Sequence, residues 1–207
     1  MKIHHKTSDT RVCFFGDSLV LGVGDPEQLG WPGRLCEDAR RKGYDATYYN
    51  LGIRGQTGVD IASRWKKEST ERLFTPHRAV QAGLVFSFGQ NDTAFIEGHR
   101  RVPIEQSIES ASDIIRGAKH LLPVLMAGPP PVADTSRHSE IRRLSTEFGS
   151  ICEAEEIPFL DVFDRLLESS VWMTEVAAVD GAHPSDSGYA VLAQMVGTWS
   201  AWRSWFE

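Results

Sequence analysis

Ser18, Asp180 and His183 are the residues whose types and spacing could perform acyl transfer. A serine hydroxyl is a weak nucleophile at neutral pH and needs a neighbouring base, and histidine suits this role because its unperturbed pKa is about 6.5. Asp180 precedes His183 by three residues, a step that can bring the carboxylate to the imidazole within a turn. It could hold the Nδ1 proton and leave Nε2 free to take the proton from Ser18. The alternative is a surface Asp–His pair that caps the last helix.

Acyl transfer also needs hydrogen-bond donors where the oxyanion develops. The chain offers three: the backbone N–H groups of Ser18 and Gly55 and the side-chain amide of Asn91. Glycine lets the backbone approach a substrate closely. Taken singly, Gly55 and Asn91 are more often plain turn residues. Each follows a predicted core strand, however, and this shared location favours a role beside Ser18.

Apolar and β-branched segments predict the strands that position these residues, over 12–15, 46–51, 84–88, 124–127 and 158–162. Apolar residues at three- and four-residue steps predict helices between them, over 29–43, 59–73, 104–122 and 141–152. A last helix carries Tyr189 and Leu192, and the segment leading to Trp172 is undecided. Strands that alternate with helices indicate a parallel sheet covered on both faces. The loops at the carboxyl ends of its strands would bring Ser18, Gly55, Asn91 and His183 together.

Length and composition fit one globular domain over residues 1–207, with 1–10 as a flexible N-terminal segment. The 207 residues are 41% hydrophobic and 24% charged, without an internal repeat or linker. A net charge of -6 without a basic stripe argues against nucleic acid or an anionic membrane as partner. No apolar run approaches the roughly 20 residues of a membrane span, and the polar N-terminus lacks a signal core. We therefore expect a cytoplasmic protein that acts on a small molecule.

The sequence contains no pattern that calls for a metal or another cofactor. Cys13, Cys36 and Cys152 are too few and too scattered for a disulfide framework or a zinc site, so we expect buried free thiols. Neither H-E-x-x-H nor C-x-x-C occurs, which argues against metal-assisted hydrolysis. Residues 22–27 do not complete G-x-G-x-x-G, and no phosphate-binding P-loop motif occurs. A non-catalytic flavodoxin-like module that binds a small molecule nevertheless stays open as the alternative.

The glycine-rich segments after the predicted strands resemble the sequence blocks of the GDSL esterases, or SGNH hydrolases. Gly16-Asp17-Ser18-Leu19 resembles the first block, and segments 50–57, 89–92 and 180–184 resemble the second, third and fifth. The resemblance, which runs from about residue 12 to 188, implies a flavodoxin-like three-layer α/β/α fold with a parallel five-stranded sheet in the order 2-1-3-4-5. It further implies Ser18 as nucleophile, His183 as base, Asp180 as its partner, an oxyanion hole made by Ser18, Gly55 and Asn91, and no cofactor.

The G-x-S-x-G elbow of the larger α/β-hydrolase family is absent, since Leu19-Val20 follow Ser18. This absence separates the chain from that family. For Asp17 and Asp92 we expect a supporting role, in which the carboxylates accept hydrogen bonds from loop N–H groups.

Substrate selectivity is the least readable property of the sequence. Phe95, Ile96 and Trp172 could line an acyl pocket, although Trp172 could equally be core. Arg54, Arg100 and Arg101 could bind an anionic substrate group or could be solvated loop charges. The possible substrates are lysophospholipids, short acyl or aryl esters, acyl thioesters and, less favoured, acetylated carbohydrates.

Overall fold

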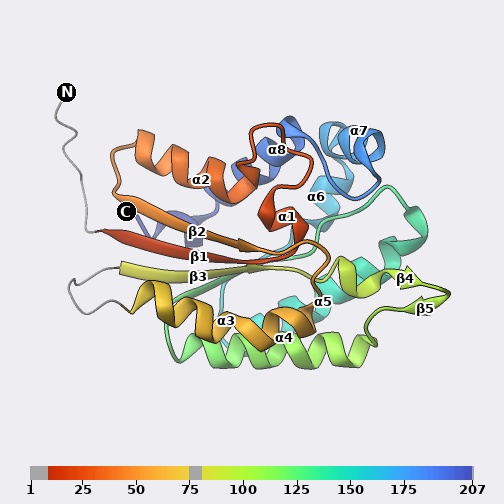
Figure 1. Cartoon of the computed structure of the whole chain (residues 1–207), viewed down its shortest axis with the longest axis horizontal. Helices are drawn as coiled ribbons and strands as arrows, with labels where there is room; N and C mark the ends of the chain where they lie inside the picture. Colours follow the sequence, from red (N-terminus) through yellow and green to blue (C-terminus); the bar gives the residue numbers. More distant parts are fainter. Residues whose placement is uncertain (1–8, 75–80, 207) are drawn as a thin grey trace.

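The computed structural model describes residues 9–74 and 81–206 and has a parallel five-stranded sheet at its centre (Figure 1). Its strands run in the order β2-β1-β3-β6-β7. Their bounds are β1 Thr10–Gly16, β2 Ala46–Gly52, β3 Gln81–Ser87, β6 Val124–Ala127 and β7 Phe159–Leu160. This order confirms the predicted arrangement 2-1-3-4-5, counted over the strands of this sheet.

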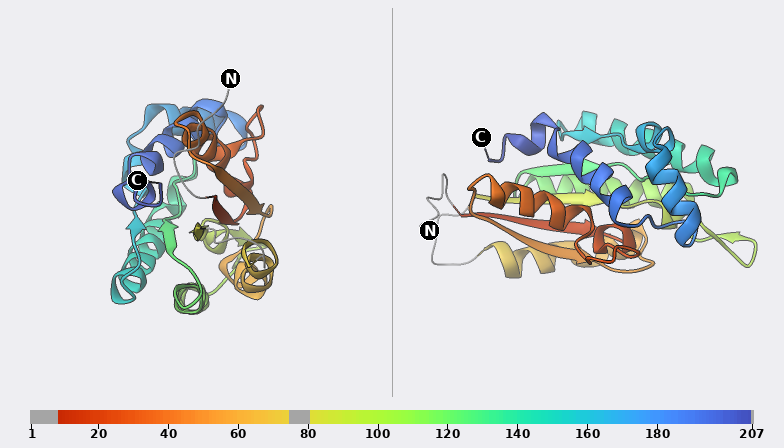
Figure 2. Two further views of the ribbon diagram at one scale, coloured as in Figure 1. Left: turned by 90° about the vertical axis from the view of Figure 1, so that its left-hand side faces the viewer. Right: turned by 90° about the horizontal axis from the view of Figure 1, so that it is seen from above.

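Helices cover both faces of the sheet, which gives the predicted three layers (Figures 1 and 2). One face is covered by α2 Gly30–Arg41, α6 Phe163–Leu167, α7 Ser170–Val179, α8 Asp186–Gly197 and α9 Ser200–Arg203. The other is covered by α3 Gly58–Leu73, α4 Ile104–Lys119 and α5 His138–Ala154. Among the described residues, no helix is long and apolar enough to cross a membrane.

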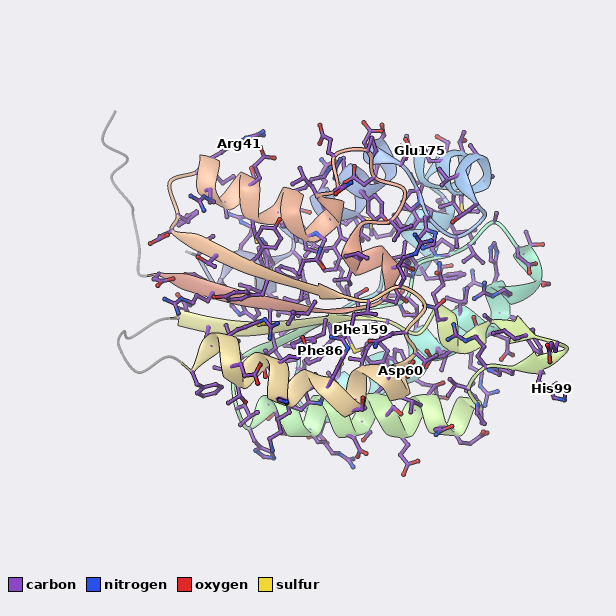
Figure 3. The ribbon with its side chains drawn as sticks, viewed as in Figure 1. Arg41, Asp60, Phe86, His99, Phe159 and Glu175 are labelled. Carbon is purple, nitrogen blue, oxygen red and sulfur yellow. The ribbon has the colours of Figure 1, made fainter. Side chains whose placement is uncertain are left out.

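The central strand β1 is apolar on both sides because each side meets a helical layer. Val12 and Phe14 pack in the core beneath α2 and α8, and Cys13 and Phe15 pack in the core beneath α3 and α4. Neighbouring strands repeat the pattern, and Phe86 of β3 points into the second core (Figure 3). All three cysteines are buried free thiols, as predicted.

The register of the three central strands brings their carboxyl ends to one level. Gly16, the last residue of β1, pairs with Gly52 of β2 and Ser87 of β3. The loops that begin after these residues therefore start side by side at one edge of the sheet. The loops that carry Ser18, Gly55 and Asn91 are these three.

Several short elements differ from the sequence-based prediction. Thr10 is buried and begins β1, so the expected flexible segment does not extend to residue 10, and residues 1–8 lie outside the described part of the chain. Residues 93–103, which lie outside the predicted strands and helices, contain a hairpin of β4 Phe95–Ile96 and β5 His99–Arg100. This hairpin projects beyond the helical layers, with His99 at its outer end (Figures 1 and 3).

Candidate active site

Ser18 is the first residue of α1, Ser18–Leu21, and is separated from the end of β1 by Asp17 alone. Asp17 is the N-cap of this short helix, and its Oδ1 accepts the Leu19 N–H at 2.9 Å. Only glycine fits at position 16, because a Cβ there would lie 2.2 Å from the Ser87 carbonyl oxygen. The tight turn from β1 into α1 thus holds a buried Ser18 at the carboxyl edge of the sheet.

His183 and Asp180 lie in the loop between α7 and α8 and reach Ser18. The His183 Nε2 lies 2.7 Å from the Ser18 Oγ, and its Nδ1 lies 2.7 Å from Asp180 Oδ2. The other oxygen of Asp180, Oδ1, accepts the backbone N–H groups of His183 at 2.9 Å and Ala182 at 3.0 Å. The three-residue step from Asp180 therefore forms a turn that fixes the carboxylate against the ring.

The environment of Asp180 keeps this carboxyl group ionised. Burial alone would raise the pKa of Asp180, but the hydrogen bonds from the His183 ring and from the backbone of His183 and Ala182 outweigh it and lower the pKa. A carboxylate can only accept, so the His183 Nδ1 carries the proton in neutral imidazole. The Nε2 atom is then free to accept the hydroxyl proton of Ser18.

Gly55 lies in the loop after β2 with its neighbourhood open. Its φ of +73° lies in the left-handed region that favours glycine, and no atom lies within 4 Å of the place where a Cβ would stand. The carbonyl oxygen of Gly55 accepts a hydrogen bond from Arg101 Nη2 at 2.7 Å. Arg101 thereby ties the end of the β4–β5 hairpin to this loop.

Asn91 begins a short 3₁₀ turn, η1 Asn91–Thr93, after β3. Its Nδ2 donates to the Gln56 carbonyl oxygen at 3.0 Å and to Asp17 Oδ2 at 3.2 Å. The amide therefore bridges the loop that carries Gly55 and the residue that precedes Ser18. The structure thus brings together all five residues singled out for the triad and the oxyanion donors.

Asp17 and Asp92 are buried carboxyl groups that hold these loops. Burial raises the pKa of Asp17 to about 7, against the lowering effect of the Leu19 N–H. Burial also raises the pKa of Asp92, whose Oδ1 accepts the Gly58 N–H at 3.0 Å at the start of α3. Both side chains accept backbone N–H groups at the starts of helices, Asp17 at α1 and Asp92 at α3, and their supporting role stays a prediction.

Trp172 does not line a pocket, so that expectation is wrong. The side chain is fully buried in the core, its indole N–H donates to the Pro131 carbonyl oxygen at 3.1 Å, and its ring meets the edge of Tyr189. Phe95 and Ile96 are 61% and 57% exposed on β4. Their contribution to substrate binding stays a prediction.

Arg64 supports the site and was not found from the sequence. From the first half of α3, its Nη2 donates to the Leu51 carbonyl oxygen at 2.8 Å and to that of Gly16 at 3.2 Å, and its Nε donates to Gln56 Oε1 at 2.6 Å. The guanidinium thus binds the carboxyl ends of β1 and β2 together. The only signal in the sequence is its place beside Trp65, which packs in the core.

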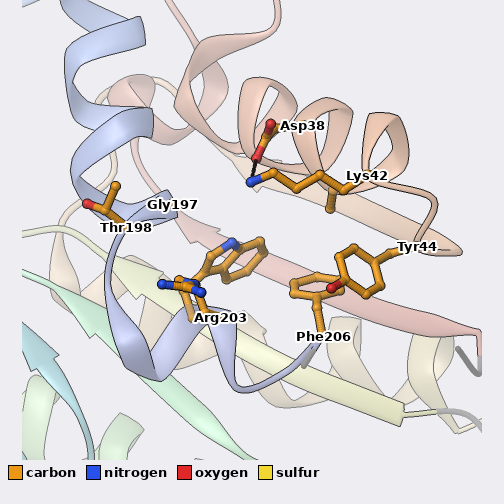
Figure 4. A pocket seen from close by; sticks show the side chains of 9 residues that line it. Asp38, Lys42, Tyr44, Gly197, Thr198, Arg203 and Phe206 are labelled. Carbon is orange, nitrogen blue, oxygen red and sulfur yellow. Dashed lines mark ion pairs between the residues drawn. The ribbon is translucent and has the colours of Figure 1, made fainter. Parts of the chain in front are cut away.

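Hollows on the surface lie both at this edge and away from it. One of about 310 Å³ lies between α2 and the C-terminal segment, where Tyr44 and Phe206 meet (Figure 4). Tyr44 precedes β2, so this hollow is at the opposite, amino end of the strands. Two others adjoin the candidate site, one of about 350 Å³ beside residues 21–25 and one of about 410 Å³ beside residues 93–95. Within 9–74 and 81–206, no group of three His, Cys, Asp or Glu side chains is placed to hold a metal.

Residues 14–191 match the GDSL-like Lipase/Acylhydrolase family. The chain belongs to this family. It is therefore an ester hydrolase of the GDSL type. The match covers every candidate residue at the carboxyl edge of the sheet, from Ser18 to His183.

Three similar proteins share 24% identity or less with this chain. The uncharacterized protein YpmR of Bacillus subtilis is 24% identical over an alignment that covers 87% of this chain and 77% of that protein. A lipase/acylhydrolase from Enterococcus faecalis has a TM-score of 0.72 at 20% identity, covering 91% of this chain and 93% of its own. A catalytic mutant of Axe2, an acetylxylan esterase from Geobacillus stearothermophilus, has a TM-score of 0.73 at 16% identity, covering 94% of this chain and 96% of its own. These two likenesses confirm the fold.

Proposed function

We propose that this GDSL hydrolase is a serine esterase that cleaves carboxylic esters of small molecules through an acyl-enzyme intermediate. The observation that carries the proposal is the continuous series of hydrogen bonds from Asp180 through His183 to Ser18, with 2.7 Å at both ring nitrogens. A binding module of flavodoxin type has no use for such a series, and membership of a hydrolase family favours catalysis.

In the proposed reaction, Ser18 Oγ attacks the ester carbonyl carbon while His183 Nε2 takes its proton. Asp180 keeps Nδ1 protonated and stabilises the imidazolium that forms. The tetrahedral intermediate then collapses, His183 gives the proton to the departing alcohol, and the acyl group stays on Ser18. Water, activated by the same histidine, releases the carboxylic acid and restores Ser18.

The oxyanion of that intermediate would accept hydrogen bonds from the Ser18 and Gly55 N–H groups and the Asn91 amide. Support for Gly55 comes from its open surroundings at a positive φ, which leave room for substrate. Support for Asn91 comes from its position between the Gln56 carbonyl and Asp17, which directs the amide toward the Ser18 loop. Preorganised donors of this kind are usually the largest single contribution to such catalysis.

The acetylxylan esterase Axe2 offers a parallel, since its catalytic mutants replace a serine, an aspartate and a histidine. The same three residue types make up the proposed triad. Such a distant relative does not fix the acyl group of the substrate for this chain.

The test is turnover of p-nitrophenyl acetate by Ser18→Ala and His183→Ala, with circular dichroism to verify folding. Both variants should keep the fold and lose all but a residual rate, because triad members act as a unit. Undiminished turnover in either one would refute the triad assignment.

A further inference from the structure

The hollow beside residues 93–95 contains buried donors that lack acceptors. It encloses about 410 Å³ between these residues and the segment that carries Asp134, Ser136, Arg137 and Glu140. Among the described residues, five buried side-chain atoms have no hydrogen-bond partner, and four of them belong to residues at or behind this wall: Gln90 Nε2, Arg100 Nε, Arg100 Nη2 and Arg137 Nε. All four are N–H donors, so the group that would satisfy them is an acceptor.

Arg137 is the cation of this cluster that lacks a carboxylate. Its Nη2 donates to the neutral oxygens of Gln90, the backbone carbonyl at 2.5 Å, and of Thr93, the hydroxyl at 3.0 Å. In the described part of the chain it forms no ion pair within 4.0 Å, and burial lowers its pKa. A half-buried guanidinium that has only neutral hydrogen-bond partners would be stabilised further by an anion in contact with it, because burial removes part of its hydration.

The acidic side chains in the wall are already engaged. Glu140 pairs with Arg100. Asp134 is exposed, and its Oδ1 accepts both the Ser136 N–H at 3.0 Å and the Ser136 hydroxyl at 2.6 Å. Arg137 is therefore the arginine of this wall without a direct ion pair in the described part of the chain, and the nearby Asp134 carboxylate only partly offsets the lowering of its pKa by burial.

The hollow is continuous with the turn that carries Asn91. Gln90, which accepts from Arg137, directly precedes Asn91, and Thr93 ends the same turn and lines the hollow. Asn91, the proposed oxyanion donor, is thus two residues along the chain from the wall of this hollow. Phe95 supplies an exposed apolar surface at its rim, against which a short chain could pack.

We propose that this hollow binds a carboxylate or phosphate carried by the ester substrate, with the Arg137 guanidinium as its principal donor. The proposal rests on the serine esterase function above and narrows its substrate class to esters with an anionic group. Arg137 lines the hollow with a guanidinium that makes no ion pair within 4.0 Å with any described residue, and it retains its bonds to the Asn91 turn through Nη2. Arginine suits this role because its planar fork matches carboxylate and phosphate oxygens.

The test compares p-nitrophenyl half esters of succinic, glutaric and adipic acid with neutral p-nitrophenyl esters of the same chain lengths. For at least one chain length, Arg137→Gln should lower the ratio of kcat/KM for the charged ester to that for the neutral ester by about tenfold or more, mainly through KM. If Arg137→Gln shifts the turn that carries Asn91, the loss of kcat/KM affects both esters equally and cancels in this ratio. Arg137→Lys, which keeps the charge without the fork, should fall between wild type and Arg137→Gln.

Arg142→Gln is the matched control, because Arg142 lies on α5, just after Arg137 at its N-cap, but pairs with Asp164 and does not line the hollow. It should leave the ratio unchanged. A ratio that is unaffected by Arg137→Gln at all three chain lengths, or that falls equally in Arg142→Gln, would overturn the proposal.

A binding measurement separates this proposal from the proposed function. Monomethyl glutarate should raise the thermal midpoint of Ser18→Ala, whereas dimethyl glutarate should not, and adding Arg137→Gln should remove the effect. No difference between the two glutarates would overturn the anion site even if Ser18 is the nucleophile. Retained turnover in Ser18→Ala would overturn the nucleophile assignment and leave the anion site intact.

Discussion

Replacing Asn91 by alanine should slow the enzyme more than it destabilises the fold. Losing one oxyanion donor typically costs about 10²–10³ in kcat. In the free protein, however, the two amide hydrogens of Asn91 already serve the Gln56 carbonyl at 3.0 Å and Asp17 Oδ2 at 3.2 Å. To donate to the oxyanion, the amide must give up or share one of these bonds, which is worth ~0.5–1.5 kcal/mol or about tenfold. We therefore expect kcat to fall about 10- to 100-fold in Asn91→Ala.

Asn50→Ala is the control for lost hydrogen bonds. The Asn50 side chain makes three bonds: its Nδ2 donates to the carbonyl oxygens of Val20 at 2.9 Å and Leu21 at 3.4 Å, and its Oδ1 accepts the Gly52 N–H at 3.1 Å. Both variants should lose ~1–4 kcal/mol of unfolding free energy, because Asn91 gives up two hydrogen bonds and Asn50 gives up three, one of them long at 3.4 Å. The assay is kcat for p-nitrophenyl acetate together with the thermal midpoint. If Asn91→Ala loses no more activity than Asn50→Ala at equal stability, Asn91 is not an oxyanion donor.

Three further predictions use the same assays. Gly55→Ala and Gly98→Ala both place alanine at a positive φ in open space, so both should lose about 1–2 kcal/mol of stability. Only the change at Gly55 should lower kcat. Equal kcat values in the two variants would argue against the Gly55 N–H as an oxyanion donor. Trp172→Ala should lower the free energy of unfolding by about 3–5 kcal/mol, because Trp172 is fully buried. Phe95→Ala should keep the thermal midpoint and raise KM for longer acyl esters. A raised KM with an unchanged thermal midpoint in Trp172→Ala would instead indicate that Trp172 lines the substrate pocket. Burial raises the pKa of Asp17 in the folded protein to about 7, above its unfolded value, so the folded state binds more protons than the unfolded state between about pH 4 and 7. The unfolding free energy of wild type should therefore fall by up to ~4 kcal/mol as the pH rises through this range. Asp17→Asn should lose this pH dependence in urea unfolding, and an equal pH dependence in wild type and variant would refute the link to Asp17.

The central sheet and the convergence of the catalytic candidates could be predicted because both depend on local patterns. Buried strands such as β1 and β3 are apolar runs that end in glycine or a polar loop, and parallel strands place those ends at one edge. The Asp180–His183 turn is equally local, since the two residues are only three positions apart in the sequence. These local patterns do not predict the hydrogen-bond distances between the site residues or how deeply each side chain is buried.

The parts that were missed depend on contacts between distant segments or on elements without periodicity. The strands β4 and β5 have two residues each, too few for an alternating pattern. Helix α7 has Val171, Trp172, Met173 and Val179 spread around it, so periodicity does not tell which side faces the core. No sequence rule connects Arg137 with Gln90 or Arg64 with Leu51, because these contacts arise only when the N-cap of α5 and the helix α3 pack against the sheet.

Covalent labelling tests most directly whether Ser18 is the nucleophile. A fluorophosphonate reacts with a serine that a neighbouring base has activated, so wild type should gain one adduct as activity disappears. Trypsin should release residues 12–34 as one peptide in which Ser18 is the only serine, so mass spectrometry can assign the site. The account predicts an adduct on this peptide that is absent in Ser18→Ala and strongly slowed in His183→Ala. Inactivation with the adduct on another peptide, or equal labelling of Ser18→Ala, would contradict it.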